Sequence, residues 1–274
     1  MRSLLHVIRG SSQAGQDLPE ILPPLTSAGI RFRRGQLALC ASAPGRGKTL
    51  FALWYAVHIA RQGEPVLYIS ADSDQGTLAN RVAAIMMSRT VNDVKEMRES
   101  EGVDDVANEL APLTTRLRID RDPNPTLDDV WEETQAFEEL LGVPPSLIVV
   151  DVLLNVHTEL DGWAGLLDAV QSFHTLARET EACVLVLHHT REETTALRPQ
   201  SMSSTMGKVN QFPELILTIC LDGDHYYIAP VKNRDGVADP KAENPLCVYA
   251  DAESMTLHST LQELETHRSR RQWV

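Results

Sequence analysis

The sequence predicts an α/β protein: a mostly parallel, twisted β-sheet flanked by helices, followed by an antiparallel extension at the C-terminal end. Short apolar runs alternate with helical segments over most of the chain before residue 214. Most of these runs are continuously apolar, which is typical of parallel strands that are covered on both faces. Beyond that point, strands follow one another with turns at Asp222-Gly223 and Asp235-Gly236, which favours antiparallel neighbours.

The individual elements follow from periodicity and from the residues that interrupt it. The first helix ends where Gly63 and Pro65 break its pattern. The isoleucine- and valine-rich run at 147–151, which follows two prolines, is the clearest strand. Strands are predicted at 37–41, 66–70, 117–119, 147–151, 184–187, 214–220, 226–231 and 246–249. Helices are predicted at 48–62, 75–88, 91–101, up to about 141, and 163–180.

Size and composition limit the organisation of the chain. Its 274 residues fit one large α/β domain, expected at 26–260, with an N-terminal arm or linker at 1–25 and a basic tail at 261–274. No apolar run approaches the roughly 20 residues of a membrane helix, and the start is too briefly apolar for a secretory signal. Four scattered cysteines favour buried thiols in a reducing compartment, so we expect a cytoplasmic protein without a membrane partner.

A phosphate-binding loop is predicted between the first strand and the first helix. The loop is rich in small residues and ends in Gly-Lys-Thr, a pattern whose backbone N–H groups cradle phosphates at a helix N-terminus. Lys48 is expected to reach the β and γ phosphate oxygens, and the Thr49 hydroxyl to ligate Mg²⁺. The first position of the pattern holds Ser42 in place of glycine. The residues predicted to bind the nucleotide are Ser42, Ala43, Pro44, Gly45, Arg46, Gly47, Lys48 and Thr49.

An acidic residue ends the strand at 147–151. A carboxylate at such a strand end can hold Mg²⁺ through its water shell, so Asp151 is the second expected metal-binding residue. Val152 stands where many ATPases carry a glutamate, so the group that orients the attacking water must lie elsewhere. Asp72, just beyond the strand at 66–70, is the candidate, with Asp74 as the alternative. A helix N-cap is the competing interpretation of Asp72.

A resemblance to a known family begins around Asp72. Residues 70–81, Ser-Ala-Asp-Ser-Asp-Gln-Gly-Thr-Leu-Ala-Asn-Arg, are similar to the segment of DnaB-type replicative helicases that carries their catalytic glutamate. Asp72 takes the place of that glutamate and is one methylene shorter. Together with the lead-in at 28–37, the ordered motifs extend the resemblance from about residue 25 to about residue 240. It implies a RecA-like P-loop ATPase core, in the compact form of phage and plasmid helicases, with ATP and Mg²⁺ as cofactors.

Two further motifs are similar to the same family. His188-His189-Thr190-Arg191 follows the strand at 184–187, where the family places a residue that senses the γ-phosphate. His189 takes that position, and a purely structural histidine is the alternative. The segment at 228–236 resembles a hairpin whose lysine and arginine reach the γ-phosphate bound by the adjacent subunit. The resemblance therefore implies catalytic roles for Lys232 and Arg234, and a solvated basic hairpin is the alternative.

The resemblance also implies an assembly and a polymer. Cations that act on a neighbour's nucleotide require a homo-oligomer, and a hexameric ring is expected. Such ATPases contact single-stranded DNA through loops at the positions of 154–163 and 191–211, where Arg191, Arg198 and Lys208 are the available cations. A flexible loop without a ligand is the alternative. The net charge of −13 neither supports nor excludes DNA, because local patches matter as much as total charge.

Three functions remain open from the sequence. The first is the motor core of a DNA helicase that hydrolyses ATP and translocates on single-stranded DNA in replication, with an unidentified loader or primase. The second is a recombination or annealing ATPase on single strands. The third is an ATP-dependent regulatory or assembly switch that binds protein and not DNA, which the acidic composition suits.

Overall fold

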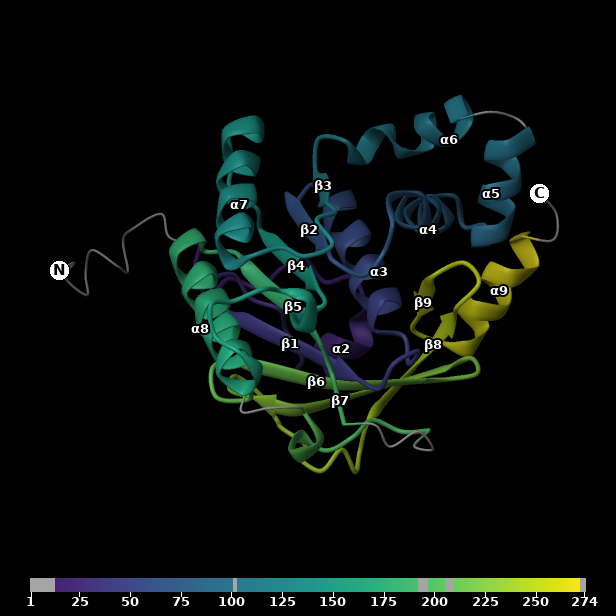
Figure 1. Ribbon diagram of the computed structural model, residues 1–274. Coiled ribbons are helices and arrows are strands. Elements are labelled where there is room, and N and C mark those ends of the chain that lie inside the picture. Colours follow the sequence, from purple (N-terminus) through teal and green to yellow (C-terminus); the bar gives the residue numbers. More distant parts are fainter. Residues whose placement is uncertain (1–12, 101–102, 192–196, 206–208, 272–274) are drawn as a thin grey trace.

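The computed structural model describes residues 13–100, 103–191, 197–205 and 209–271, and its strands form one sheet in the order β3-β2-β4-β5-β1-β6-β7-β8-β9 (Figure 1). The strands are β1 (Leu37–Ser42), β2 (Val66–Ser70), β3 (Leu117–Asp120), β4 (Leu147–Asp151), β5 (Cys183–His189), β6 (Leu215–Asp222), β7 (His225–Asn233), β8 (Leu246–Asp251) and β9 (Thr256–His258). The α-helices are α2 (Pro23–Ser27), α3 (Lys48–Arg61), α4 (Gln75–Met87), α5 (Val91–Ser100), α6 (Val103–Leu110), α7 (Leu127–Leu141), α8 (Gly162–Thr180) and α9 (Leu261–Arg271).

The direction of the strands divides the sheet into two parts. Strands β3, β2, β4, β5, β1 and β6 are mutually parallel, and β7, β8 and β9 continue the sheet in antiparallel pairs. The change occurs at the short turn between β6 and β7, because a tight turn can join only antiparallel strands. The predicted parallel sheet with a C-terminal antiparallel extension is confirmed.

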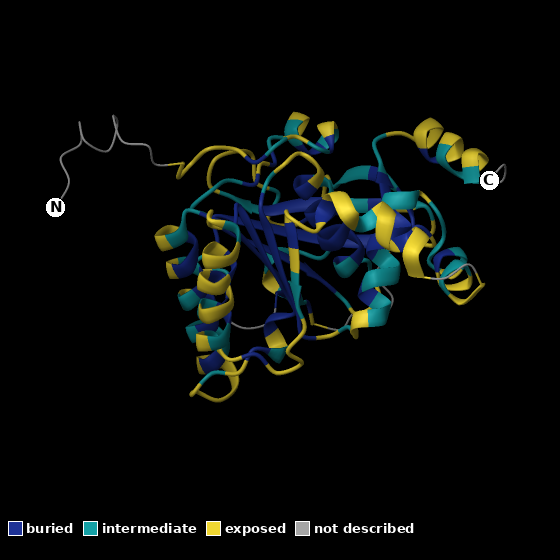
Figure 2. Ribbon diagram, turned by 90° about the horizontal axis from the view of Figure 1, so that it is seen from above, coloured by how far each residue is buried: buried dark blue, intermediate teal, exposed yellow. Residues whose placement is uncertain are grey.

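Both faces of the parallel part are covered, which explains its continuously apolar strands. Successive side chains of a strand point to opposite faces. In β2, Val66 and Tyr68 belong to the core beneath α3, whereas Leu67 and Ile69 pack in the core beneath α7 and α8. Figure 2 shows the buried sheet enclosed by helices whose outer surfaces are exposed. Among the described residues, no helix is both long enough and apolar enough to cross a membrane.

The two ends of the described chain pack more tightly than the sequence suggests. We expected an arm or linker at 1–25, but Leu18, Leu22 and Leu25 are buried in the core beneath α3; residues 1–12 of that segment lie outside the described residues. We expected a basic tail at 261–274, but residues 261–271 form α9, whose Leu264 is fully buried. In both segments, leucine side chains are buried against parts of the chain that are distant in sequence, which the local pattern does not reveal.

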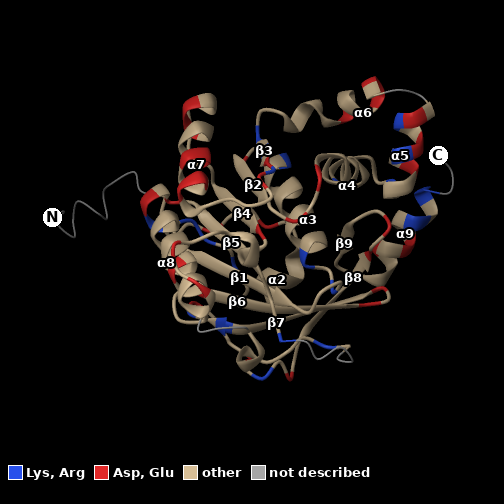
Figure 3. Cartoon of the chain, viewed as in Figure 1, with Lys and Arg blue, Asp and Glu red and all other residues tan. Residues whose placement is uncertain are grey.

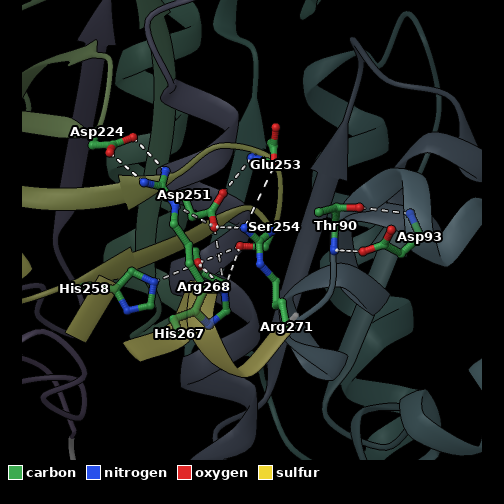
Figure 4. A network of polar contacts seen from close by, with 11 residues as sticks. Thr90, Asp93, Asp224, Asp251, Glu253, Ser254, His258, His267, Arg268 and Arg271 are labelled. Carbon is green, nitrogen blue, oxygen red and sulfur yellow. Dashed lines mark hydrogen bonds and ion pairs between the residues drawn. The ribbon is translucent and has the colours of Figure 1, made fainter. Parts of the chain in front are cut away.

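A buried carboxylate fastens α9 to the sheet (Figure 4). The Asp251 side chain at the end of β8 is 1% exposed, and its Oδ2 lies 2.7 Å from Arg271 Nη2 and 3.5 Å from Arg268 Nε. Arg268 also donates two hydrogen bonds to the Asp224 carboxylate, at 2.6 and 2.7 Å. The arginines of α9 therefore hold this helix against the sheet. Without them, the Asp251 carboxylate would remain buried with fewer partners, which lowers stability.

Arg271→Ala is expected to lower the free energy of unfolding by about 2 kcal/mol, since it removes the closest cation from a buried carboxylate. Denaturant unfolding followed by circular dichroism measures the change. Arg270→Ala is the matched control, because Arg270 is an exposed arginine of the same helix, and a change of less than about 0.5 kcal/mol is expected. Equal losses in the two variants would contradict a specific role for the buried pair.

Candidate active site

All but one of the predicted motifs lie at the carboxyl edge of the parallel strands; the exception is the segment with Lys232 and Arg234. Ser42 at the end of β1 is in register with His189 of β5. Asp151 at the end of β4 is in register with Ser70 of β2. Since β2, β4, β5 and β1 are consecutive in the sheet, the loops that leave them share one edge, where open α/β sheets bind their ligands.

The phosphate-binding loop has the backbone that its glycines allow. Gly45 and Gly47 have φ angles of 71° and 89°, in the left-handed region that favours glycine. At Gly47, a Cβ atom would lie 2.8 Å from a ring carbon of Tyr226, whose hydroxyl donates to the Gly47 carbonyl at 3.0 Å. Gly47 is the N-cap of α3, so the N-terminus of this buried helix points into the loop. Such an end provides unpaired N–H groups for an anion.

The structure accounts for the unusual first position of the loop. Ser42 is the last residue of β1, and in this fully described loop positive φ angles occur only at the two glycines already named. A position with extended backbone does not require glycine. The Ser42 side chain is also in use, because its Oγ accepts a hydrogen bond from Lys48 Nζ at 3.2 Å. Serine therefore preserves the loop.

Lys48 lies at the centre of the site. Its Nζ donates to the carbonyls of Ser42 and Ala43 at 3.1 and 3.2 Å and lies 3.3 Å from His189 Nδ1. Burial lowers the pKa of Lys48, and the nearby Asp151 and Asp72 carboxylates raise it. The Lys48 ammonium group therefore donates to backbone oxygens, and the oxygens of a bound phosphate can replace these acceptors. The His189 ring contacts the same ammonium group.

Asp151 and Thr49 form an oxygen-rich pair beside Lys48. The Asp151 carboxylate is 2% exposed and accepts a hydrogen bond from the Tyr68 hydroxyl at 2.8 Å. Burial raises the pKa of Asp151, while hydrogen bonds from Tyr68 and Thr49 lower it. Hard oxygen donors of this kind suit Mg²⁺. The buried hydroxyl of Ser70, next to Asp151, has no hydrogen-bond partner among the described residues, which also fits a hydrated ion.

The two acidic residues after β2 have different surroundings. Asp74 is the N-cap of α4: its carboxylate accepts from the Thr77 backbone N–H at 3.0 Å and from the Thr77 hydroxyl at 2.6 Å. Asp72 is exposed, and the preceding Ala71 donates its N–H to the Asp151 carbonyl at 2.8 Å. The capping role considered for Asp72 therefore belongs to Asp74, and the Asp72 charge is near enough to Lys48 and Asp151 to raise the pKa of both.

Lys232 and Arg234 lie at the opposite edge of the sheet. Because β7 runs antiparallel to β6, its first residue pairs with Asp222 near the phosphate-binding loop, and Asn233 pairs with Leu215 at the other end. Arg234 lies 3.7 Å from the carboxylate of Glu214, which contacts the first residue of β1. Within one chain, these cations and the phosphate-binding loop are thus separated by the length of a strand.

The two loops predicted to contact DNA are described in part. Residues 153–155 form a short 3₁₀ helix, and the following loop leads to Trp163, which is 56% exposed beside the exposed Leu154 and Leu160. In the second loop, Arg191 and Arg198 are exposed, and Lys208 lies outside the described residues. Figure 3 shows Asp and Glu positions concentrated on α7, which has no Lys or Arg, so this fully described helix presents an acidic and not a basic face.

Sequence reasoning missed two tyrosines that complete the site. Tyr68 in β2 orients the Asp151 carboxylate, and Tyr226 in β7 packs against Gly47. Both are fully buried. A buried tyrosine hydroxyl needs a partner, so a tyrosine within an apolar strand is a usable signal. The signal does not identify the partner, because Asp151 is 83 residues from Tyr68.

This fold, with a glycine-containing phosphate loop and an acidic strand end at one sheet edge, is the RecA-like P-loop fold. The chain belongs to the AAA domain family, whose model matches residues 11–195. Among its relatives, the gene 65 protein of Mycobacterium phage L5 is 35% identical over 251 residues, which are 86% of this chain and 90% of that protein. The gene 65 protein of Mycobacterium phage D29 is 31% identical over 219 residues, 76% of this chain and 92% of that protein.

Solved structures confirm the predicted DnaB-type fold. One of them, an ATPase domain, has a TM-score of 0.77 at 16% identity, and the match covers 94% of this chain and 96% of that chain. A DnaB-like replicative helicase, described with its interactions with primase, has a TM-score of 0.76 at 15% identity, covering 93% of this chain and 64% of that chain. The DNA repair protein RAD51 homolog 4 of Bos taurus is 26% identical over 185 residues, 61% of this chain and 50% of that protein.

Proposed function

We propose that this chain is the motor core of a DNA helicase: a hexameric ring that hydrolyses ATP between subunits and translocates on single-stranded DNA in replication. The observation that carries the proposal is the division of the catalytic groups between two edges of the sheet. Lys48, Asp151 and Asp72 share one edge, and Lys232 and Arg234 lie at the other. Head-to-tail contact between copies would bring the two halves together, and a closed series of such contacts is a ring.

Each residue at the carboxyl edge has a separate role in the proposed reaction. The N–H groups of the loop and Lys48 bind the phosphates, and Thr49 with Asp151 hold Mg²⁺, which neutralises charge on the phosphate oxygens when it is bound. Asp72 orients the attacking water, because a carboxylate can accept its proton. Val152 cannot take this role, since its side chain is apolar and buried. His189 contacts Lys48 and is the last residue of β5, so it reports the presence of the γ-phosphate to the chain that continues from Thr190.

Lys232 and Arg234 complete the neighbour's site. Charge develops on the transferred phosphoryl group, and a cation supplied by another subunit stabilises it. The Arg234 side chain is 52% exposed, as a group that reaches across an interface must be. The fold shared with ATPase domains of DnaB-like helicases supports the helicase assignment, and the phage relatives suit a compact replication protein.

Recombination or annealing on single strands is the second candidate. It is favoured by the match to the RAD51 homolog, whose name describes a DNA repair protein. The fold and the nucleotide chemistry are the same in both proposals, and only the work done on DNA differs. Strand pairing without unwinding would support this second function.

Asp72→Asn is expected to lower the turnover of ATP by about 10²-fold or more, because it removes the base with little change of shape. The affinity for a fluorescent ATP analogue, measured separately, should stay within about threefold. Asp74→Asn is the matched control: asparagine caps helices as well as aspartate does, so fold and turnover should both persist. If Asp74→Asn is the inactive variant, the base is Asp74 and the assignment of Asp72 is wrong.

The motor function predicts ATP-dependent unwinding of a forked DNA duplex, measured by the separation of a fluorophore-quencher pair on its strands. Single-stranded DNA should raise the rate of ATP hydrolysis and, with ATP, produce ring-sized particles in mass photometry. Lys48→Ala should abolish both turnover and unwinding, because it removes the charge that compensates the phosphates. Turnover that ignores DNA would support a protein-directed switch instead.

Arg234→Ala is expected to lower turnover by about 10³-fold, yet to be partly rescued by mixing with Lys48→Ala protein. In rings mixed at equal amounts, about a quarter of interfaces combine the intact loop of the first variant with the intact Arg234 of the second. Turnover is measured across mixing ratios at constant total protein. Turnover that equals the sum of the two separate variants at every ratio would exclude action between subunits.

A further inference from the structure

We propose that Glu214 is a positioning residue for ATP hydrolysis, which holds Lys232 and Arg234 in the geometry that the neighbouring active site needs. The inference rests on the proposed function, because it assumes that these two cations act between subunits. Glu214 precedes β6 at the amino edge of the parallel strands, far from its own phosphate-binding loop. No role in its own nucleotide site is therefore available to it.

The Glu214 carboxylate is fixed to β1, which lies between β5 and β6 in the parallel part of the sheet. Its side chain is 10% exposed, and Oε2 accepts a hydrogen bond from the Leu37 N–H at 3.0 Å. The Glu214 backbone N–H donates to the Leu37 carbonyl at 2.9 Å, so main chain and side chain both hold the first residue of β1. From the other side, His174 Nε2 of α8 lies 3.3 Å from Oε1. The carboxylate is a rigid anion.

The two cations are arranged around this anion. Arg234 Nη1 lies 3.7 Å from Glu214 Oε1, and the Arg234 backbone N–H donates to the Glu214 carbonyl at 3.0 Å. Lys232 Nζ donates to the carbonyls of Asn210 and Gln211 at 2.7 and 3.2 Å, and Arg234 Nη2 lies 3.4 Å from the Gln211 carbonyl. Both side chains are thus held by the short segment that leads into Glu214.

Electrostatics explains why an anion is needed at this point. Lys232 and Arg234 are two residues apart at the end of β7, and their like charges repel each other. Burial lowers the pKa of Lys232, the Arg234 charge lowers it further, and the Glu214 charge raises it. Glu214 therefore favours the charged state of Lys232 and offsets the repulsion that would separate the pair. The contact between Glu214 and Arg234 is long, and the guanidinium is half-exposed. The Arg234 side chain can therefore still bind the phosphate of a neighbouring subunit.

Glu214→Gln tests the proposal, because the amide oxygen can still accept the Leu37 N–H while the charge is lost. The kcat for ATP is expected to fall about 10- to 100-fold, since misplaced catalytic groups cost rate even at small displacements. The KM for ATP should change little, because the subunit's own phosphate-binding loop is untouched. Glu243→Gln is the control: it removes an exposed carboxylate that pairs only with exposed Lys241 in the described residues, and wild-type kinetics are expected.

Mixing experiments separate positioning from a general structural defect. If Glu214 serves Arg234, Glu214→Gln protein is rescued by Lys48→Ala protein, which supplies intact cations, and is not rescued by Arg234→Ala protein. If the change instead damages β1 and its loop, the reverse pattern appears and the proposal is wrong. Wild-type kcat in Glu214→Gln would also overturn it. Absence of rescue between Arg234→Ala and Lys48→Ala, by contrast, would refute the proposed function itself.

Glu214→Asp provides a second variant that retains the charge on a shorter side chain. It is expected to turn over ATP faster than Glu214→Gln because the charge is kept, and to show the same pattern of rescue because the shorter side chain still displaces the two cations. Thermal unfolding by circular dichroism checks that each variant is folded. If Glu214→Gln does not fold, the rescue pattern of Glu214→Asp decides the question, and equal rescue by both partners would overturn the proposal.

Discussion

The hydrogen bonding of β1 between β5 and β6 is the constraint on which the rest of this structure depends. At its carboxyl end, the pairing places Ser42 beside His189 and directs the phosphate-binding loop toward α3. At its amino end, the same strand binds Glu214 through Leu37. A strand of six residues spans about 20 Å, so these two groups of polar residues are held at a fixed separation by one backbone.

Burial on both faces makes that backbone rigid. Leu39 and Cys40 are fully buried on opposite sides of β1, in the core beneath α8 and the core beneath α3 respectively. Close-packed interiors resist small displacements, and each large apolar side chain that is buried contributes about 1.5–3 kcal/mol. The polar groups at the strand ends are consequently held in fixed positions by the packed core. The carboxylate of Asp72 and the guanidinium of Arg234 are exposed and remain accessible to a ligand.

The sequence was most informative where one local pattern is sufficient. Continuous apolar runs identify the parallel strands, and the glycines of the phosphate loop require one backbone shape. It was least informative where the partner is distant: the three-residue β9 has no periodicity to read, and the leucines at 18–25 reveal their burial only against α3. The choice of Asp74 as the cap, and not Asp72, depends on where α4 begins, which local preference does not specify to within two residues.

Strand β7 touches both halves of the proposed machinery. Near its beginning, Tyr226 is wedged against Gly47 of the subunit's own loop, and at its end stand Lys232 and Arg234, directed away from it. A single hydrogen-bonded strand cannot shift at one end without pulling on the other. In the proposed assembly, where Lys232 and Arg234 act on the neighbouring subunit's nucleotide, β7 would connect two nucleotide sites, so a displacement at one site would be transmitted along the strand to the next. In a closed ring, these strands would link every site to the next in the same rotational order.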